Sequence, residues 1–448
     1  MIKPLIVVQG PVATRSGYGN HTRDIVRSLI AMDKYEVKII SLPWGHCPMN
    51  ALNIQDPNDK PIIDRFLKQQ LNKQPEIFIQ ISVPNEFCMA PDGKTPIKPG
   101  KFNIGVTAGV ESNILPHSCL EGINRMDLVI ATSKHTADII KRTVFDKMNN
   151  KTNKKEGELK CETPLEVLFE GADLGIYHKT DTIDKTVVDE LSQIPEKFCF
   201  LVCGHWIKGD LGQDRKDIGM TIKTFCESFK GISKQNKPAL ILKSSGAGFS
   251  IMDRTSIMDK VNSITSEYGD RAPNVYLLHG DLSDNEMNSL YNHPKIKAMV
   301  SFTKGEGFGR PLLEFSLTGK PIIVSNWSGH LDFLHPEHSV LLPGNLTQVH
   351  PSAADNFILK DAKWFTVNYQ FASKVLKDVE KNYKRYLEKS RKHPEHSRKN
   401  FSLEKMTEAF SEILTKYVPE QQELKLPKLK KVSNVPELKL PKLKKVKI

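Results

Sequence analysis

Two kinds of apolar pattern alternate along most of the chain. Short runs rich in β-branched residues, such as LIVVQG at 5–10, are followed by longer stretches whose apolar residues recur at helical spacing, such as 20–32. This alternation is typical of a parallel sheet whose strands are connected by crossover helices. In the first half of the chain it predicts strands at 5–10, 36–42, 76–82, 102–108, 127–133 and 165–171.

A second set of apolar runs begins after Pro195. It predicts strands at 198–204, 239–245, 274–280, 297–303 and 320–326. With 448 residues, the chain exceeds the size at which a single core usually stops growing. We therefore predict two Rossmann-like, doubly wound α/β domains, at 1–190 and 191–390. Ligands bind beyond the carboxyl ends of the strands in such sheets, so two facing domains would form a cleft that holds the chemistry.

Polar segments and helix caps fill in the rest of the chain. The lysine-rich segment 146–164 is expected to be an exposed loop. Ser133 is a suitable N-cap for the helix that follows it. Beyond Pro351 the pattern looks helical, and Ser402 with Glu404 opens an amphipathic helix within 391–417.

The last part of the chain, 418–448, contains a repeat. ELKLPKLKKV at 423–432 returns at 437–446, and the 31 residues carry nine lysines and three glutamates. They therefore hold half of the net charge of +12. Proline and dense lysine favour a disordered, solvated tail, and an anionic partner for the tail is the alternative.

Composition narrows the class of protein. Apolar residues make up 39% and charged residues 26%, which is ordinary for a globular protein. No apolar run approaches the roughly 20 residues of a transmembrane helix, and the first apolar run resembles a strand more than a signal sequence. Seven cysteines without paired CxxC spacing are expected to be free thiols. We therefore expect a cytoplasmic protein.

The segment 303–321, TKGEGFGRPLLEFSLTGKP, combines a strand end, a glycine-rich turn and a helix. Pro311 suits a first helical turn, where no N–H is needed, and Gly319 suits the helix end. Backbone amides at the start of this helix would be free to bind an anion such as phosphate. The residues expected to supply them are Gly307, Phe308, Gly309 and Arg310. No Gly-Lys-Ser/Thr follows, so the turn is not a Walker loop.

Two glutamates flank this anion site. Glu314, just over one turn into the helix, could accept two hydrogen bonds from a ribose diol, and Glu306, on the turn, could accept hydrogen bonds from sugar hydroxyls on the far side. A ligand with a phosphate between two sets of hydroxyls fits this arrangement. The segment therefore predicts a nucleotide sugar as the ligand.

With GKPIIVSNWSGHLDFL at 319–334, the segment resembles the Glu-x7-Glu signature of retaining glycosyltransferases of the GT-B fold. This group, glycosyl transferases group 1, includes glycogen and sucrose synthases and many mannosyltransferases. The resemblance covers nearly all of 1–417 in the order of elements. It implies two Rossmann-like domains facing across a cleft, with the acceptor on the N-terminal side and the donor on the C-terminal side. A hexose would pass from a nucleotide-diphosphate sugar to an unknown glycan, lipid or protein.

Other segments extend the resemblance on the donor side. RSGYGNH at 15–21 resembles the family's N-terminal glycine loop, which implies donor contacts at Gly17 and Gly19. GHWIKGDLGQDRKDIG at 204–219 resembles its diphosphate-binding segment. Here Lys216 matches the family's lysine, Arg215 lies beside it, and His205 stands where arginine is usual.

Three further positions follow from the same resemblance. Glu111, in TAGVES, lies about where the family keeps a histidine or an acid near the acceptor. HGDLSD, with Leu282 at its centre, would hold the base through backbone groups, and EGADLGIYH at 170–178 resembles the phrase that closes the N-terminal domain. The helix that ends near Tyr417 resembles the one that packs back on that domain.

The resemblance also implies a mechanism. Lys216, Arg215 and the helix N-terminus would stabilise the charge that develops on the departing diphosphate, and losing one such donor typically costs about 10² to 10³ in rate. Glu306 would orient the sugar, and the departing phosphate could take the acceptor proton with retention of configuration. No DxD metal motif is needed, so neither a metal nor a cofactor is expected beyond the nucleotide sugar itself.

Each assignment has a structural alternative. Glu306 and Glu314 could be ordinary loop and helix acids, and Lys216 and Arg215 could be surface charges. His21 and His117 are expected to be ordinary hydrogen-bonded or exposed histidines, and Trp364 a packing residue.

Two other functions compete with the first. The positive charge and the lysine tail would suit a glycosyltransferase that acts on modified DNA bases, whose DNA affinity would fall steeply with salt. The body of the chain is only mildly basic and lacks interleaved aromatic residues, which counts against this second interpretation. The third interpretation is an inactive carbohydrate-binding or assembly protein with the same fold, which would bind a sugar nucleotide and leave it intact.

Overall fold

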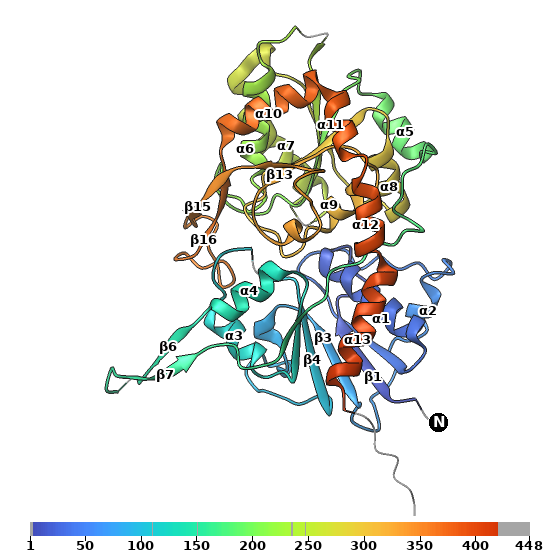
Figure 1. Cartoon of the computed structure of the whole chain (residues 1–448), viewed down its shortest axis with the longest axis vertical. Coiled ribbons are helices and arrows are strands. Elements are labelled where there is room, and N and C mark those ends of the chain that lie inside the picture. Colours follow the sequence, from blue (N-terminus) through green and yellow to red (C-terminus); the bar gives the residue numbers. More distant parts are fainter. Residues whose placement is uncertain (1–2, 110, 150, 234–235, 247, 420–448) are drawn as a thin grey trace, which may run out of the picture.

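The chain folds into two α/β lobes stacked along the long axis of the molecule (Figure 1). The computed structural model describes residues 3–109, 111–149, 151–233, 236–246 and 248–419. The lower lobe in Figure 1 holds the N-terminal strands and the last helix, and the upper lobe holds the strands that follow Cys199.

The N-terminal sheet has six parallel strands in the order β2-β1-β3-β4-β5-β8. These are β1 (Leu5–Gly10), β2 (Glu36–Ser41), β3 (Ile77–Ile81), β4 (Phe102–Thr107), β5 (Leu128–Ala131) and β8 (Leu165–Val167). The strand order reverses between β1 and β3. In doubly wound sheets the crevice at such a reversal is where ligands bind.

The C-terminal sheet also has six parallel strands, in the order β11-β10-β9-β12-β13-β14. They are β9 (Cys199–Cys203), β10 (Ala239–Lys243), β11 (Val275–Leu278), β12 (Ile296–Ser301), β13 (Ile322–Ser325) and β14 (Val340–Leu342). This is the strand order of the Rossmann fold, with its reversal between β9 and β12. The glycine-rich turn at 303–309 leaves β12 at that point.

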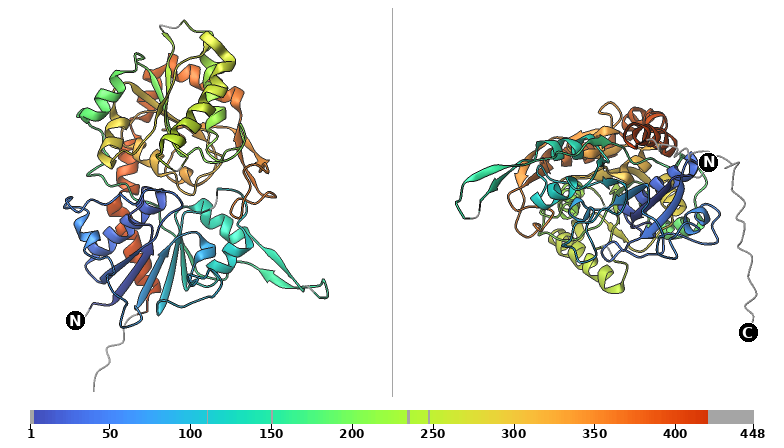
Figure 2. Two further views of the ribbon diagram at one scale, coloured as in Figure 1. Left: turned by 180° about the vertical axis from the view of Figure 1, so that it is seen from behind. Right: turned by 90° about the horizontal axis from the view of Figure 1, so that it is seen from below.

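Helices cover both faces of each sheet (Figures 1 and 2). The α-helices are α1 (Gly17–Met32), α2 (Lys60–Ile63), α3 (His117–Ile123), α4 (Lys134–Arg142), α5 (Lys185–Ser192), α6 (Ile218–Phe229), α7 (Ile251–Thr265), α8 (Asp284–Asn292), α9 (Arg310–Ser316), α10 (Tyr369–Lys381), α11 (Tyr383–Ser390), α12 (His393–Phe401) and α13 (Leu403–Tyr417). Short 3₁₀ turns are η1 (Pro84–Glu86), η3 (Ser266–Arg271) and η4 (Gly329–Asp332). Separate apolar clusters fill the space on the two sides of each sheet.

The chain returns to the N-terminal lobe at its end. Helices α12 and α13 run from the upper lobe down onto the lower one (Figure 1). Met406 and Phe410 of α13 are buried in the same apolar cluster as Ile25 of α1. The Ser28 hydroxyl also forms a hydrogen bond with the Thr407 hydroxyl at 2.8 Å. The last helix therefore ties the two lobes together.

All eleven strands expected from the apolar runs are present, and the caps at Ser133 and Ser402 are confirmed by their hydrogen bonds to the amides of Thr136 and Lys405. Two expectations were wrong. The segment 146–164 is not simply a loop, because β6 (Phe145–Met148) and β7 (Lys155–Leu159) form an antiparallel hairpin that projects from the lobe (Figure 2). The region after Pro351 is not all helical either.

That second error concerns β16 (Lys363–Val367), which pairs antiparallel with β15 (Gly344–Gln348). Trp364 of β16 is fully buried in a small apolar cluster, so its predicted packing role is confirmed.

All seven cysteines are free thiols, as expected. Among the described residues, no helix combines the length and apolar character that crossing a bilayer requires. The repeats at 423–432 and 437–446 lie outside the described residues.

Candidate active site

The glycine-rich turn after β12 lies directly against the N-terminal lobe. A Cβ atom on Gly307 would lie 1.6 Å from the Ala108 carbonyl oxygen, and one on Gly305 would lie 2.2 Å from the Glu111 carbonyl oxygen. Side chains at these two positions would push the lobes apart. Two of the glycines in GEGFG therefore serve the close approach of the lobes, a role that the sequence did not indicate.

Glu306, between those glycines, is the centre of an ion cluster. Its carboxylate accepts a hydrogen bond from Lys216 and lies 3.6 Å from the Arg215 guanidinium. Arg215 in turn lies 3.5 Å from the Glu111 carboxylate and donates to the Gly305 carbonyl oxygen at 3.2 Å. Residues from both lobes therefore meet here. The four residues predicted to act in catalysis, from three separate segments, form one group.

The two cations fix the charge of Glu306. Burial alone would raise the pKa of Glu306, but Lys216 and Arg215 outweigh it and hold this pKa at about 2. Burial lowers the pKa of Lys216, an effect that the ion pair with Glu306 opposes. Glu306 is therefore ionised at neutral pH and can accept hydrogen bonds.

The backbone around Glu306 is held from the same lobe. Its amide donates to the Ser328 hydroxyl at 2.9 Å, and its carbonyl oxygen accepts from the Gly329 amide at 3.0 Å. No acceptor within the described part of the chain takes the amides of Gly307, Phe308 or Gly309. Gly309 has a φ of 98°, a conformation that favours glycine. The turn thus has donors available for an anion at the start of α9.

Glu314 is buried on α9 and already has two partners. Its carboxylate accepts from the Arg310 guanidinium at 2.9 Å and from the Tyr291 hydroxyl at 3.2 Å. Burial raises its pKa to about 7, although Arg310 opposes this shift. An ionised carboxylate offers about four lone-pair sites, so two remain for a ligand such as a diol.

The Arg310 side chain crosses to the N-terminal lobe. Its guanidinium pairs with the Asp24 carboxylate of α1 and lies 3.9 Å from the Glu170 carboxylate. Arg310, Asp24, Glu170 and Glu314 are all buried, so one cation serves three acids between the lobes. Burial raises the pKa of Glu170 to about 8, and the neighbouring acids add to the shift.

His21 lies next to this second cluster. Its ring is buried, and neither nitrogen has a hydrogen-bond partner among the described residues. Burial, with a further contribution from Arg310, lowers its pKa to about 3, so the ring is neutral. His117 is exposed at the start of α3, as expected for an ordinary surface histidine.

The N-terminal glycine loop opens α1. The Ser16 hydroxyl accepts from the Gly19 amide at 3.0 Å, which caps the helix. A Cβ on Gly19 would lie 2.3 Å from the Thr14 carbonyl oxygen, so this glycine is required by packing. Gly17 has open space where a Cβ would stand. Of the two predicted donor contacts, only Gly17 is accessible enough to serve as one.

Arg15, just before this loop, links it to the predicted base-binding turn. Its guanidinium lies 2.7 Å from the Asp281 carboxylate and donates to the Leu282 carbonyl oxygen at 3.3 Å. Asn50 also donates to Asp281, at 3.2 Å. The segment around Leu282 therefore contacts the N-terminal lobe.

Solved structures of other proteins share this architecture. Sucrose-phosphate synthase from Thermosynechococcus elongatus superposes with a TM-score of 0.60 at 13% identity, over 92% of this chain and 99% of that chain. A glycosyltransferase from Rickettsia africae gives 0.58 at 12%, over 94% and 100%. Anabaena HepE in complex with UDP-glucose gives 0.56 at 13%, over 92% and 100%. The chain has the GT-B fold. No family model and no curated protein sequence matches it.

In a GT-B fold the cleft lies between the carboxyl edges of the two sheets, and here the Glu306 group occupies the strand-order reversal of the C-terminal sheet. At 12–13% identity the structural likeness establishes the fold and leaves the chemistry to the residues of this chain. The sequence resemblance to the GT-B fold is therefore confirmed at the level of architecture.

Further polar residues lie at the same edge, of which only His205 was named from the sequence. His205, which follows β9, forms a hydrogen bond with the Ser245 hydroxyl at 3.0 Å, and burial lowers its pKa to about 4. Lys243, at the end of β10, donates to the Gly280 carbonyl oxygen at 2.6 Å. His330 is buried behind Glu306, with a hydrogen bond to the Ser325 carbonyl oxygen at 2.7 Å. A polar residue at the end of an apolar strand is the signal that could have identified Lys243, whereas His330, in η4, carries no such signal.

Proposed function

We propose that this chain is a glycosyltransferase that takes a hexose from a nucleotide-diphosphate sugar and transfers it with retention of configuration. The observation that carries the proposal is the Glu306 group at the strand-order reversal of the C-terminal sheet. There, Lys216 and Arg215 lie beside a glycine turn whose amides have no acceptor among the described residues. Two cations and several amides in one buried place suit a diphosphate.

The roles of the residues follow from their charges. Lys216 and Arg215 would stabilise the negative charge that develops on the leaving diphosphate. Glu306 is held ionised by both cations, so it can accept hydrogen bonds from the sugar hydroxyls and keep the two cations in place before the donor arrives. Preorganised donors of this kind need no reorganisation during the reaction, which is why they lower the barrier.

Glu314 would take the ribose. Two of its lone-pair sites are used by Arg310 and Tyr291, which fix the orientation of the carboxylate, and the others can accept from the ribose diol. Arg310 would therefore contribute in two ways. Its backbone begins α9 at the anion site. Its side chain lies between the lobes, where it pairs with Asp24 and orients the Glu314 carboxylate.

Retention is part of the proposal because the segment around Glu306 resembles the retaining group. The departing phosphate would take the proton of the acceptor hydroxyl on the face from which it leaves. No residue of the chain is required as a covalent nucleophile. Neither a metal nor a cofactor is proposed for the step, since the cations that face the leaving group are Lys216 and Arg215.

The test is a screen of nucleotide sugars with different bases and hexoses. A donor at 100 times its dissociation constant should stabilise the protein by about 2.7 kcal/mol, seen as a rise in the thermal midpoint. Glu314→Ala should abolish that rise, whereas Glu388→Gln, an exposed acid on α11, should leave it unchanged. The configuration of the product, read by NMR, then reports retention. A screen without binding or turnover would refute the proposal.

A further inference from the structure

One pentapeptide occurs twice in the chain. His-Pro-Glu-His-Ser stands at 335–339 and again at 393–397. The first copy forms a turn between η4 and β14, and the second forms the first turn of α12. The function proposed above uses neither copy.

The two copies meet in space. Ring centroids of His335 and His338 are 5.5 Å apart, and those of His393 and His396 are 6.4 Å apart. Between the copies, His335 lies 6.2 Å from His396, and His338 lies 6.0 Å from His393. Each of the four imidazole rings therefore lies next to two of the others, so that together they form one compact group. In a tetrahedral zinc site, ring centroids lie about 5 Å apart, because Zn–N bonds are about 2 Å long.

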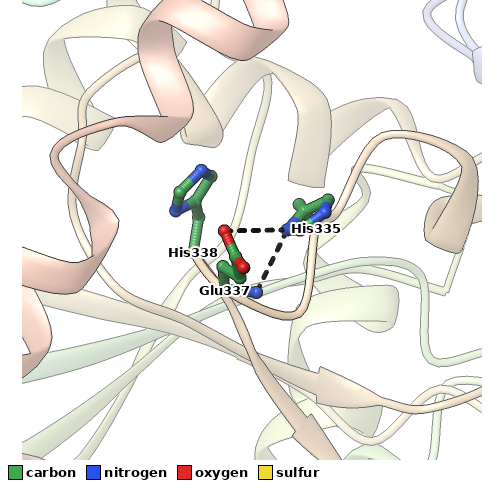
Figure 3. A group of neighbouring side chains, drawn as sticks. All are labelled: His335, Glu337 and His338. Atoms are coloured by element: carbon green, nitrogen blue, oxygen red, sulfur yellow. Dashed lines mark hydrogen bonds and ion pairs between the residues drawn. The ribbon is translucent and has the colours of Figure 1, made fainter.

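The first copy already gathers three ligand groups. His335, Glu337 and His338 each offer one ligand atom, and these atoms lie within 4.8 Å of one another. Figure 3 shows the Glu337 carboxylate between the two rings, 4.0 Å from the His335 Nδ1 atom. The turn is closed by a hydrogen bond from the His338 amide to the His335 carbonyl oxygen at 2.9 Å. The backbone thus fixes the spacing of these side chains.

His393 completes the set from α12. Its ring is fully buried, and its Nε2 atom lies 3.3 Å from the Phe333 carbonyl oxygen. Its Nδ1 atom has no hydrogen-bond partner in the described part of the chain. An imidazole that donates one nitrogen to a backbone carbonyl presents the other as a lone pair, which is how histidines are usually oriented toward a metal.

We propose that the chain binds a divalent transition metal ion, of the zinc class, through His335, Glu337, His338 and His393. Imidazole and carboxylate ligands suit zinc, cobalt, nickel and copper better than magnesium or calcium. The ligand atoms of His335, Glu337 and His338, now within 4.8 Å of one another, would close to the roughly 3.4 Å of a tetrahedral site. The His393 ring, whose centroid is 6.0 Å from that of His338, would move toward them. His335 would exchange its hydrogen bond from the Glu337 amide, at 3.2 Å, for the metal.

The consequence of such a site is a link between the lobes. The metal would join the turn after η4 to α12, and α12 continues into α13, which packs on the N-terminal lobe. A four-coordinate site made only of protein ligands is a structural one, since it leaves no open position for a substrate. The metal would therefore have a structural role: it would fix the start of α12, which leads into α13, and would take no part in the transfer reaction.

The experiment uses the untagged full-length protein after treatment with a chelator. Titration with Co²⁺, followed by its visible absorption, and with Zn²⁺, followed by calorimetry, should show one tight equivalent, with no response to Mg²⁺. Zn²⁺ should also raise the thermal midpoint. Both effects should disappear in His335→Ala/His338→Ala and persist in His350→Ala, a histidine whose side chain is about as exposed as that of His335.

A further variant tests the contribution of His393, the ligand from the second copy of the pentapeptide. His393→Ala should shift the Co²⁺ spectrum and weaken Zn²⁺ binding by at least about tenfold, the equivalent of 1.4 kcal/mol. Equal binding by the parent and by His335→Ala/His338→Ala would overturn the proposal and would point to the free cysteines instead. An unchanged spectrum in His393→Ala would overturn the link to α12.

Discussion

The two ion clusters between the lobes differ in their ratio of cations to acids. Around Glu306, two cations face two acids, and the pKa of Glu306 is held at about 2. Around Arg310, one guanidinium faces three buried acids, and the pKa values of Glu314 and Glu170 rise to about 7 and 8. Both clusters bring residues of the two lobes together.

This difference between the clusters indicates a separate role for each. In the first cluster, two cations lie beside glycine-turn amides that have no acceptor among the described residues, so they can face a diphosphate. In the second cluster, three acids already surround the Arg310 guanidinium. The first cluster is therefore suited to the ligand, and the second holds the lobes together and orients Glu314. Removing a cation from each cluster should accordingly affect different measurements.

The largest effect is expected on removing the cation of the second cluster. Arg310→Leu removes the nearest cation from three buried acids, of which Asp24 keeps Arg27 at 4.0 Å and Glu314 keeps the Tyr291 hydroxyl at 3.2 Å. Breaking a buried ion pair in this way typically costs about 3 to 5 kcal/mol. Urea denaturation should show this loss. Arg385→Leu, which removes an exposed pair with Asp378, should cost no more than about 1 kcal/mol. Equal losses in the two variants would mean that the second cluster does not hold the lobes.

Removing a cation from the first cluster should act mainly on the rate. Lys216→Met should lower turnover of a sugar nucleotide by about 10² to 10³, because a preorganised donor to the leaving group is lost. The matched control is Lys223→Met on α6, whose lysine pairs with Glu267 at the surface. Turnover that stays within a few-fold of the parent would remove Lys216 from the mechanism.

The smallest effect is a dependence of stability on pH. Glu170 has an ordinary pKa of 4.5 and a folded pKa of about 8, so between these values the folded chain binds the extra proton. Stability should therefore fall as the pH rises through this window, by up to about 1.4 kcal/mol per pH unit for each proton.

Histidines with lowered pKa, such as His21 and His205, act in the opposite sense, but only below about pH 6.5. Between pH 6.5 and 8.5 these histidines no longer contribute, but Asp217 and Lys320, each with a pKa of about 7, titrate there as well. The contribution of Glu170 to the urea midpoints is therefore read from the difference between the parent and a Glu170 variant. Glu170→Gln should flatten the decline, while Glu388→Gln should leave it as in the parent. A decline that persists in Glu170→Gln would assign it to other groups.

The two clusters also differ in how far the sequence could predict them. Part of the Glu306 group follows from a local rule, since Glu306 and Glu111 each lie just beyond the end of a predicted strand, and such ends lie at the ligand-binding edge of a sheet. Arg215 and Lys216 lie further along a loop and were identified by the resemblance alone. The contact between Arg310 and Asp24 joins residues 286 positions apart in the chain. Neither residue stands out in its own helix, so no periodic pattern reveals this pair.

The same contrast applies to the fold. Most strands of the two sheets are buried and their apolar runs were readable, although the short strand β14 was not predicted. The β6–β7 hairpin, in contrast, is mostly exposed and lysine-rich. Its strands are held by backbone hydrogen bonds, which leave no apolar pattern in the sequence. The β15–β16 pair was missed because Trp364 and Phe365 lie in a segment that is otherwise polar.

The most direct test of the central claim is calorimetric titration with UDP, GDP and ADP, each beside its nucleoside. If the Glu306 turn holds a diphosphate against Lys216 and Arg215, one of the three should bind at least about tenfold more tightly than its nucleoside, and Lys216→Met should remove that advantage. If every diphosphate binds no better than its nucleoside, the turn is not a diphosphate site and the proposed function is wrong.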